Sequence, residues 1–440
     1  MNTSTDRVWI QVRSQKERLP ALYGEIDFQA VPERFTDDPA LSITPRPVFC
    51  GPAPTAEQIE LVRAYTMMGD VVADAYAALM PEHGFRGLIG MLEDACARGV
   101  ASVRDAPPEL VAFLRDMERT PAWVDMKLVR EGARLERNSA ANIAPIAIRG
   151  TFVATFLNKY AALPMALTGQ LSSGAAARRV KETASFFTTT VLPGALNRYG
   201  AGFRAAAMVR LMHSMVRFNA LRRSDAWDSR IYGVPIPQVD QMPAGLIPVV
   251  IMASRALEQG RTSFTPEERA RVEFSRYRCF LLGLPEDLLA DTPERIVQIM
   301  AARNTTLREA FDDEICGELI RGTLSAYLGP DESLRSRLHD DLEKRFSRVF
   351  FVRTFLQGDY RRAAAMGIET TPADLAAYAA VAGAAMGNLT AYRAAMRTPV
   401  LRALADRVLV MRLQQQLKRY GQAEYASDHA SYRSGGTAAA

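Results

Sequence analysis

The chain has 440 residues, 48% of them hydrophobic and 23% charged, a composition that excludes wholesale disorder and allows a large buried core. Its 54 basic and 49 acidic residues leave a net charge of +5. These charges are spread along the chain and not gathered on one aromatic-rich element, so the sequence predicts no nucleic-acid binding. Four cysteines without a CxxC pair argue against a zinc ribbon or a disulfide framework.

The N-terminal segment shows no pattern typical of a targeting signal. The first twenty residues hold neither an apolar core nor a twin-arginine pair, and no run of about 20 apolar residues occurs in the chain. We therefore expect a cytoplasmic protein without a transmembrane segment. Residues 1–54 are polar and rich in proline, with no sustained period, which predicts an extended N-terminal arm.

Helical periodicity begins after Thr55, which is expected to cap a helix, and recurs almost to the end of the chain. Strand patterns are nearly absent, so we predict an all-α fold with one large helical domain at 55–424 and a disordered tail at 425–440. An alanine-rich helix near 374–396 could pack internally or against a second copy in a homodimer. Helices are expected near 56–80, 86–98, 108–119, 126–139, 145–170, 175–191, 201–222, 243–257, 266–282, 294–304, 307–328, 332–357, 372–396 and 398–420.

Four histidines limit the metal chemistry that the chain can support. The sequence has no HExxH motif, Walker A loop or GxSxG elbow, and no Glu-x-x-His pair of a di-iron bundle. His83 lies in a turn, His339 among charged residues and His429 in the tail, so each is expected at the surface. His213 is the remaining candidate ligand.

His213 lies in an amphipathic segment between two arginines on the same helical face. Arg210, His213 and Arg217 stand at i, i+3 and i+7, with apolar neighbours. Such an imidazole suits a haem iron, and the two guanidiniums would suit its propionates. The alternative is a histidine of the core, with both arginines paired to Asp or Glu elsewhere.

A second helix, near 175–191, places polar groups on one face. Arg179, Glu182, Thr183 and Phe186 recur at i, i+3, i+4 and i+7. Burying such groups is costly unless they pair with one another or serve a ligand. The alternative is a surface pair of Arg179 with Glu182.

Taken together, these motifs resemble the family of latex-clearing proteins and MpaB-type oxygenases. The resemblance rests on R-x-x-x-T at Arg179–Thr183, R-x-x-H-x-x-x-R at Arg210–Arg217, the stretch Trp227–Met242 and, more weakly, Gly283–Pro293, and it spans about residues 60–400. It implies a globin-like core that holds one haem b, with His213 as the proximal iron ligand and Arg210 and Arg217 beside the propionates. Arg179 and Thr183 would lie on the distal side.

The resemblance also implies an oxygenase that uses O₂ and a small apolar unsaturated substrate, with cleavage of a carbon–carbon double bond. Rubber-cleaving members carry a lysine directly before the distal threonine, whereas this chain has Glu182 there and Lys181 one position away. We expect Glu182 to act as the proton-transfer group and the substrate to be an intracellular isoprenoid, lipid or aromatic compound. The alternatives are a haem protein with a peroxidase-like or carrier role, and a helical interaction module without haem.

Overall fold

The computed structural model describes residues 4–43, 49–167 and 173–421, and the tail expected at 425–440 lies outside these ranges. Every regular element within them is helical, apart from two isolated β-bridges. The predicted all-α fold is therefore confirmed. Within the same ranges, no helix combines the length and the apolar character that a bilayer span requires.

The described chain forms two compact units, each assembled from separate stretches of sequence. Unit 1 takes the described residues of 1–132 and 196–309, and unit 2 takes those of 133–195 and 310–426. The chain therefore alternates between the units, and no linker separates one from the other as successive domains. One helix, α7 (Met126–Asn142), contains the first crossing point.

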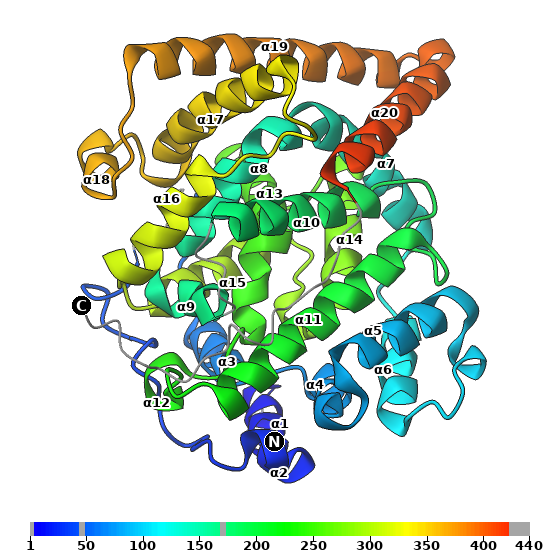
Figure 1. Cartoon of the computed structure of the whole chain (residues 1–440), viewed down its shortest axis with the longest axis vertical. Helices are drawn as coiled ribbons and strands as arrows, with labels where there is room; N and C mark the ends of the chain where they lie inside the picture. Colours follow the sequence, from blue (N-terminus) through cyan, green and yellow to red (C-terminus); the bar gives the residue numbers. More distant parts are fainter. Residues whose placement is uncertain (1–3, 44–48, 168–172, 422–440) are drawn as a thin grey trace. The chain divides into compact units, whose positions relative to one another are not determined.

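Unit 1 is built around the long helix α11 (Ala201–Arg223), which contacts α4, α5 and α14 (Figure 1). A second group is formed by α13 with α15, α3 and α14. The remaining bounds are α1 Ser4–Arg18, α2 Pro20–Tyr23, α3 Ala56–Thr66, α4 Val71–Ala77, α5 Met80–Arg98, α6 Pro108–Glu118, α12 Ser229–Tyr232, α13 Gln238–Glu258, α14 Pro266–Leu281 and α15 Pro293–Thr306, with short 3-10 turns at Val100–Ser102 and Glu286–Leu288.

The N-terminal segment differs from the extended arm expected for 1–54, because it begins with helices α1 and α2. Only a narrow stripe of the described part of α1 is buried, formed by Thr5, Val8, Val12 and Gln15. The Gln15 amide donates to the Met67 carbonyl at 3.0 Å and accepts from the Gly69 N–H at 2.9 Å. The buried stripe of α1 contains only two apolar residues, Val8 and Val12. The helix therefore shows little hydrophobic periodicity, and the sequence pattern did not predict it.

Unit 2 packs α17 between α8 and α19, and α20 contacts α19 and α10 (Figure 1). Arg149 on α8 is fully buried and pairs with Glu343 at 2.6 Å and Asp340 at 3.0 Å on α17. The bounds are α8 Ala144–Val153, α9 Lys159–Leu167, α10 Ser173–Thr190, α16 Glu318–Ser325, α17 Leu334–Phe355, α18 Tyr360–Ala365, α19 Pro372–Arg397 and α20 Pro399–Tyr420, with a 3-10 turn at Ala154–Phe156 and a π-helical turn at Asp313–Gly317.

Three expected helices are interrupted. The described part of the segment 145–170 forms α8 and α9, which are separated by the 3-10 turn at Ala154–Phe156. The segment 56–80 breaks after Thr66, where the Asp70 side chain accepts from the Ala73 N–H and so caps a new helix, α4. The segment 307–328 is helical only from the π-turn and α16 onward. Leu307 and Arg308 instead form β-bridges with Phe35 and Ser42 of the N-terminal segment. Pairing with a distant part of the chain explains why local periodicity overestimated this helix.

The buried carboxylate of Asp240, on α13, is expected to stabilise the fold through two arginines. Asp240 accepts from Arg34 and from Arg303, each at 2.9 Å. Burial alone would raise the pKa of Asp240, but the two guanidiniums hold it below its ordinary value. A carboxyl with a lowered folded-state pKa stabilises the fold above the unfolded pKa of about 3.9, and this contribution is lost as the pH falls through the folded-state value.

Asp240→Asn is therefore expected to lower the free energy of unfolding by about 3–5 kcal/mol at neutral pH, since it leaves two buried guanidiniums without their carboxylate. Urea unfolding at neutral and acidic pH measures both the loss and its pH dependence. Asp228→Asn is the control, because Asp228 pairs with the exposed Arg230 and is expected to change stability by less than about 0.5 kcal/mol. Equal losses in the two variants would contradict the prediction.

Candidate functional site

The first set of candidate residues lies on α11. From Arg210 to Ala220 every residue of this helix is buried except His213, which is partly exposed. Arg210 and Arg217 stand one turn to either side of it. The imidazole is thus partly exposed on a helix whose neighbouring residues are enclosed.

The His213 ring is oriented by a chain of amides. Its Nδ1 lies 3.3 Å from the Oε1 of Gln241 on α13. Gln241 donates from Nε2 to Gln238 at 2.9 Å, and Gln238 donates to the Gly69 carbonyl at 3.2 Å. A partner at one ring nitrogen fixes the tautomer and directs the other nitrogen toward a ligand.

Arg210 is buried among acidic and aromatic side chains. It pairs with Asp70 at 2.5 Å and Asp116 at 2.8 Å, and its guanidinium lies 5.1 Å from the Phe113 ring centroid. Burial alone would lower the pKa of Arg210, but the two carboxylates raise it, so the group stays charged. Its Nη1 is buried and has no hydrogen-bond partner in the described structure. One donor of this arginine therefore remains available to an acceptor.

Arg217 is fully enclosed and its donors are taken up by the protein. It donates to the carbonyls of Pro235 at 2.9 Å and Ile236 at 2.8 Å, and pairs with Asp74. Asp74 also accepts from the Tyr23 hydroxyl, and burial raises the pKa of Tyr23 well above its ordinary value, so this phenol keeps its proton. Both arginines thus have aspartate partners, the alternative left open by the sequence, and contact with propionates stays a prediction.

The sequence stretch 227–242 contacts α11 at Arg217 and His213. The Trp227 indole donates to the Gly233 carbonyl at 2.9 Å, which closes the loop that presents Pro235 and Ile236 to Arg217. Gln241 then follows at the start of α13 and faces His213. The residues of this stretch therefore position the α11 face.

The weaker block that starts at Gly283 has a related structural role. Gly283 has a φ of +87°, and an added Cβ would lie 2.6 Å from the Arg210 Nε. Only glycine accepts both the backbone conformation and this close approach. At Gly283 the backbone of this block therefore lies directly against the Arg210–Asp70 ion pair.

The acidic partners Asp70, Asp74 and Asp116 were not predicted from the sequence. A signal was present, because Asp70 and Asp74 stand at i and i+4 in the apolar segment 66–80. Two carboxylates on the buried side of a helix require cationic partners. Arg210 and Arg217, two turns apart on α11, supply them.

The second set of candidates lies on α10, in unit 2. Arg179 Nη1 lies 3.4 Å from Glu182 Oε2, so the expected pair forms, but with only 15% and 9% of the side chains exposed. Thr183 is partly buried on the same helix. Lys181, on another face, donates to the Gly329 carbonyl at 3.1 Å, and burial lowers the pKa of Lys181.

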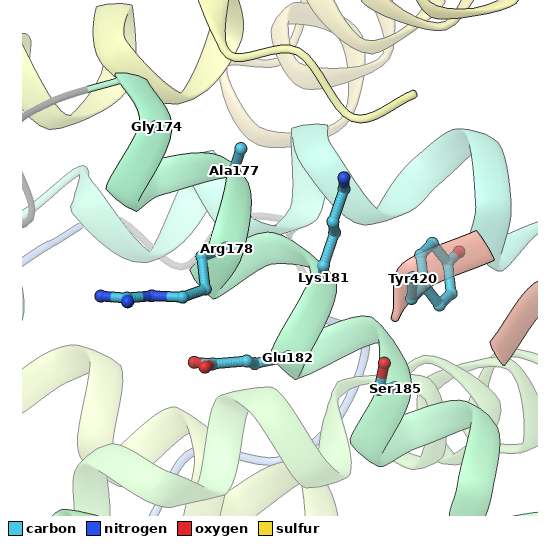
Figure 2. A pocket seen from close by; sticks show the side chains of 7 residues that line it. All are labelled: Gly174, Ala177, Arg178, Lys181, Glu182, Ser185 and Tyr420. Carbon is cyan, nitrogen blue, oxygen red and sulfur yellow. The ribbon is translucent and has the colours of Figure 1, made fainter. Parts of the chain in front are cut away.

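A cavity of about 220 Å³ opens beside α10 (Figure 2). Lys181 and Ser185 rise from α10 near Tyr420 of α20, whereas Arg178 and Glu182 extend side by side (Figure 2). The Ser185 Oγ is buried without a hydrogen-bond partner in the described structure. Burial raises the pKa of Tyr420 to about 12, so its phenol is neutral at physiological pH. The cavity therefore combines one carboxylate with several hydrogen-bond donors.

The structure brings each set of candidates together on its own helix: Arg210, His213 and Arg217 in unit 1, and Arg179, Glu182 and Thr183 in unit 2. No group of three or more His, Cys, Asp or Glu side chains that could hold a metal ion occurs in the described parts of the chain.

Comparison with known proteins identifies the family and the fold of the chain. Residues 140–398, more than half of the chain, match the family described as the catalytic domain of ER-bound oxygenase mpaB/B' and rubber oxygenase. The solved structure of latex clearing protein LCP in the closed state is similar, with a TM-score of 0.54 at 17% identity, over 80% of this chain and 91% of that one. No match was found among curated proteins. The structural likeness supports the fold, and the family match covers both α10 and α11.

Proposed function

Because the chain belongs to the family of mpaB-type and rubber oxygenases, and is an oxygenase, we propose that it works with a haem b. The observation that carries this proposal is His213, a partly exposed imidazole on a buried helix, with Nδ1 held by Gln241. A proximal haem histidine has this combination of an oriented ring and an accessible face.

The residues of α11 fit such a group in a second respect. The buried Arg210 Nη1 has no partner in the described structure, and a propionate carboxylate is the kind of acceptor that would satisfy it. His213 would hold the iron and Arg210 a propionate, while Arg217 and its aspartate would keep the helix face in place. The haem would supply the iron centre for O₂ activation.

The side chains of α10 would supply the polar chemistry. Glu182 would hold and move a proton at its carboxylate, Arg179 would keep that carboxylate in position at 3.4 Å, and the Thr183 hydroxyl would offer a hydrogen bond. A glutamate takes the position where rubber-cleaving members are expected to have lysine. We therefore propose a small unsaturated isoprenoid, lipid or aromatic substrate, whose double bond is cleaved, in preference to a polymer.

Two measurements test the proposed function. The purified full-length protein, reconstituted with haem, is expected to show a Soret band and to consume O₂ with a short unsaturated isoprenoid but not with its saturated analogue. A Soret band without O₂ uptake across a panel of olefins would indicate a carrier or peroxidase-like protein and overturn the oxygenase proposal for these substrates. Absence of the Soret band would overturn the haem assignment. A cytoplasmic location and a homodimer stay predictions.

A further inference from the structure

Helix α20 has two apolar faces, and the described residues of the chain cover only one of them. Its inner face is buried through Ala405, Leu409 and Leu413. Its outer face exposes 87% of Val400 and 59% of Leu404. A helix that is apolar on both sides is ordinarily enclosed on both. The outer side chains are Val400, Leu401, Leu404, Val408 and Met411.

The same surface is strongly basic. Between 393 and 419 the sequence has seven basic residues and one acidic residue, Asp406. Asp406 faces inward to Arg137, which it pairs with at 2.6 Å. The exposed basic residues are Arg393, Arg397, Arg402, Arg407, Lys418 and Arg419. Within 393–419 the exposed apolar stripe is therefore bordered by basic residues and by no exposed acidic residue.

We propose that the corner where α19 meets α20, defined as residues 393–411, binds the surface of an anionic lipid bilayer (Figure 1). Apolar side chains bordered by Arg and Lys are the feature by which amphipathic helices lie in the bilayer interface. Each basic side chain near an anionic surface adds attraction, which salt screens. Val400 and Leu404 would enter the headgroup region, and the arginines would contact lipid phosphates.

A second copy of the chain is a poorer occupant of this surface. Two such corners would bring equal sets of arginines together, and like charges across an interface are unfavourable. The corner also begins at the end of the residues that match the oxygenase family, since that match ends at residue 398 and α20 lies beyond it. The bilayer proposal is therefore independent of the chemistry proposed above.

A matched apolar stripe in the same unit provides the control. Helix α17 exposes 75% of Leu334 and 62% of Leu338, at i and i+4. The sequence from 331 to 345 contains five acidic and four basic residues, so this stripe has no excess of positive charge. Exposed leucine alone, without the basic border, is not expected to bind an anionic surface.

The experiment is co-sedimentation of the full-length protein with phosphatidylcholine vesicles that contain increasing amounts of phosphatidylglycerol. Binding is expected to rise with phosphatidylglycerol and to fall with added salt. Leu404→Glu, and separately Arg402→Glu combined with Arg407→Glu, are each expected to weaken binding by about tenfold or more. Leu338→Glu is expected to bind like the unchanged protein. Circular dichroism checks that each variant is folded.

Three results would overturn the proposal. The first is binding that does not depend on phosphatidylglycerol, and the second is an equal loss in Leu338→Glu. The third is a dimer in light scattering that Leu404→Glu dissociates while vesicle binding is absent, which would assign the face to a second copy. Turnover of a detergent-dispersed substrate is expected to be unchanged in Leu404→Glu, so failure of membrane binding is distinguishable from failure of the oxygenase assignment.

Discussion

His213→Ala is expected to abolish haem retention, with loss of the Soret band and of all oxygenase turnover. The His213 imidazole would be the protein ligand of the iron, and α11 contains no second histidine that could replace it. Its Nδ1 contact with Gln241 at 3.3 Å sets the ring orientation. The measurement is haem absorbance per protein after reconstitution and gel filtration, together with the melting temperature.

Two variants sharpen this prediction. His339→Ala removes an exposed histidine of α17 and is expected to retain haem fully. Gln241→Leu keeps the ligand but removes its hydrogen-bond partner, so haem affinity is expected to fall by about 10–100-fold without complete loss. Full haem retention in His213→Ala, or equal losses in the two histidine variants, would contradict the assignment.

The candidate residues on α11 could be predicted from the sequence because they depend on the spacing within one helix. Arg210, His213 and Arg217 required only the helical period to be placed on a common face. Their partners could not be predicted in the same way, because Asp70 and Asp74 lie some 140 residues earlier in the chain. Which buried charges pair with one another is decided by the folded unit. The sequence shows only that a charged residue lies in an apolar segment and therefore needs a partner.

The fold followed the sequence best where helix ends are capped by local side chains. Thr265 and Glu268 form a reciprocal capping box at the start of α14, and Thr371 and Asp374 do so at α19. The pattern was less informative for α13, which begins at Gln238 and continues through Pro243 and Pro248. Proline ordinarily disrupts a helix interior, so the sequence predicted a later start. Tertiary packing of α13 against α15, α3 and α14 offsets that local cost.

Glu182→Gln is expected to lower oxygenase turnover by about a hundredfold to ten-thousandfold while haem binding is retained, because the amide cannot take up a proton. Glutamine keeps the size of the side chain and can still accept a hydrogen bond from Arg179, so the structure of α10 should be preserved. O₂ uptake and product formation measure the effect. Glu318→Gln, the same change at an exposed position of unit 2, is expected to leave turnover unaltered. Turnover of Glu182→Gln equal to that of the control would show that the proton is transferred by another group.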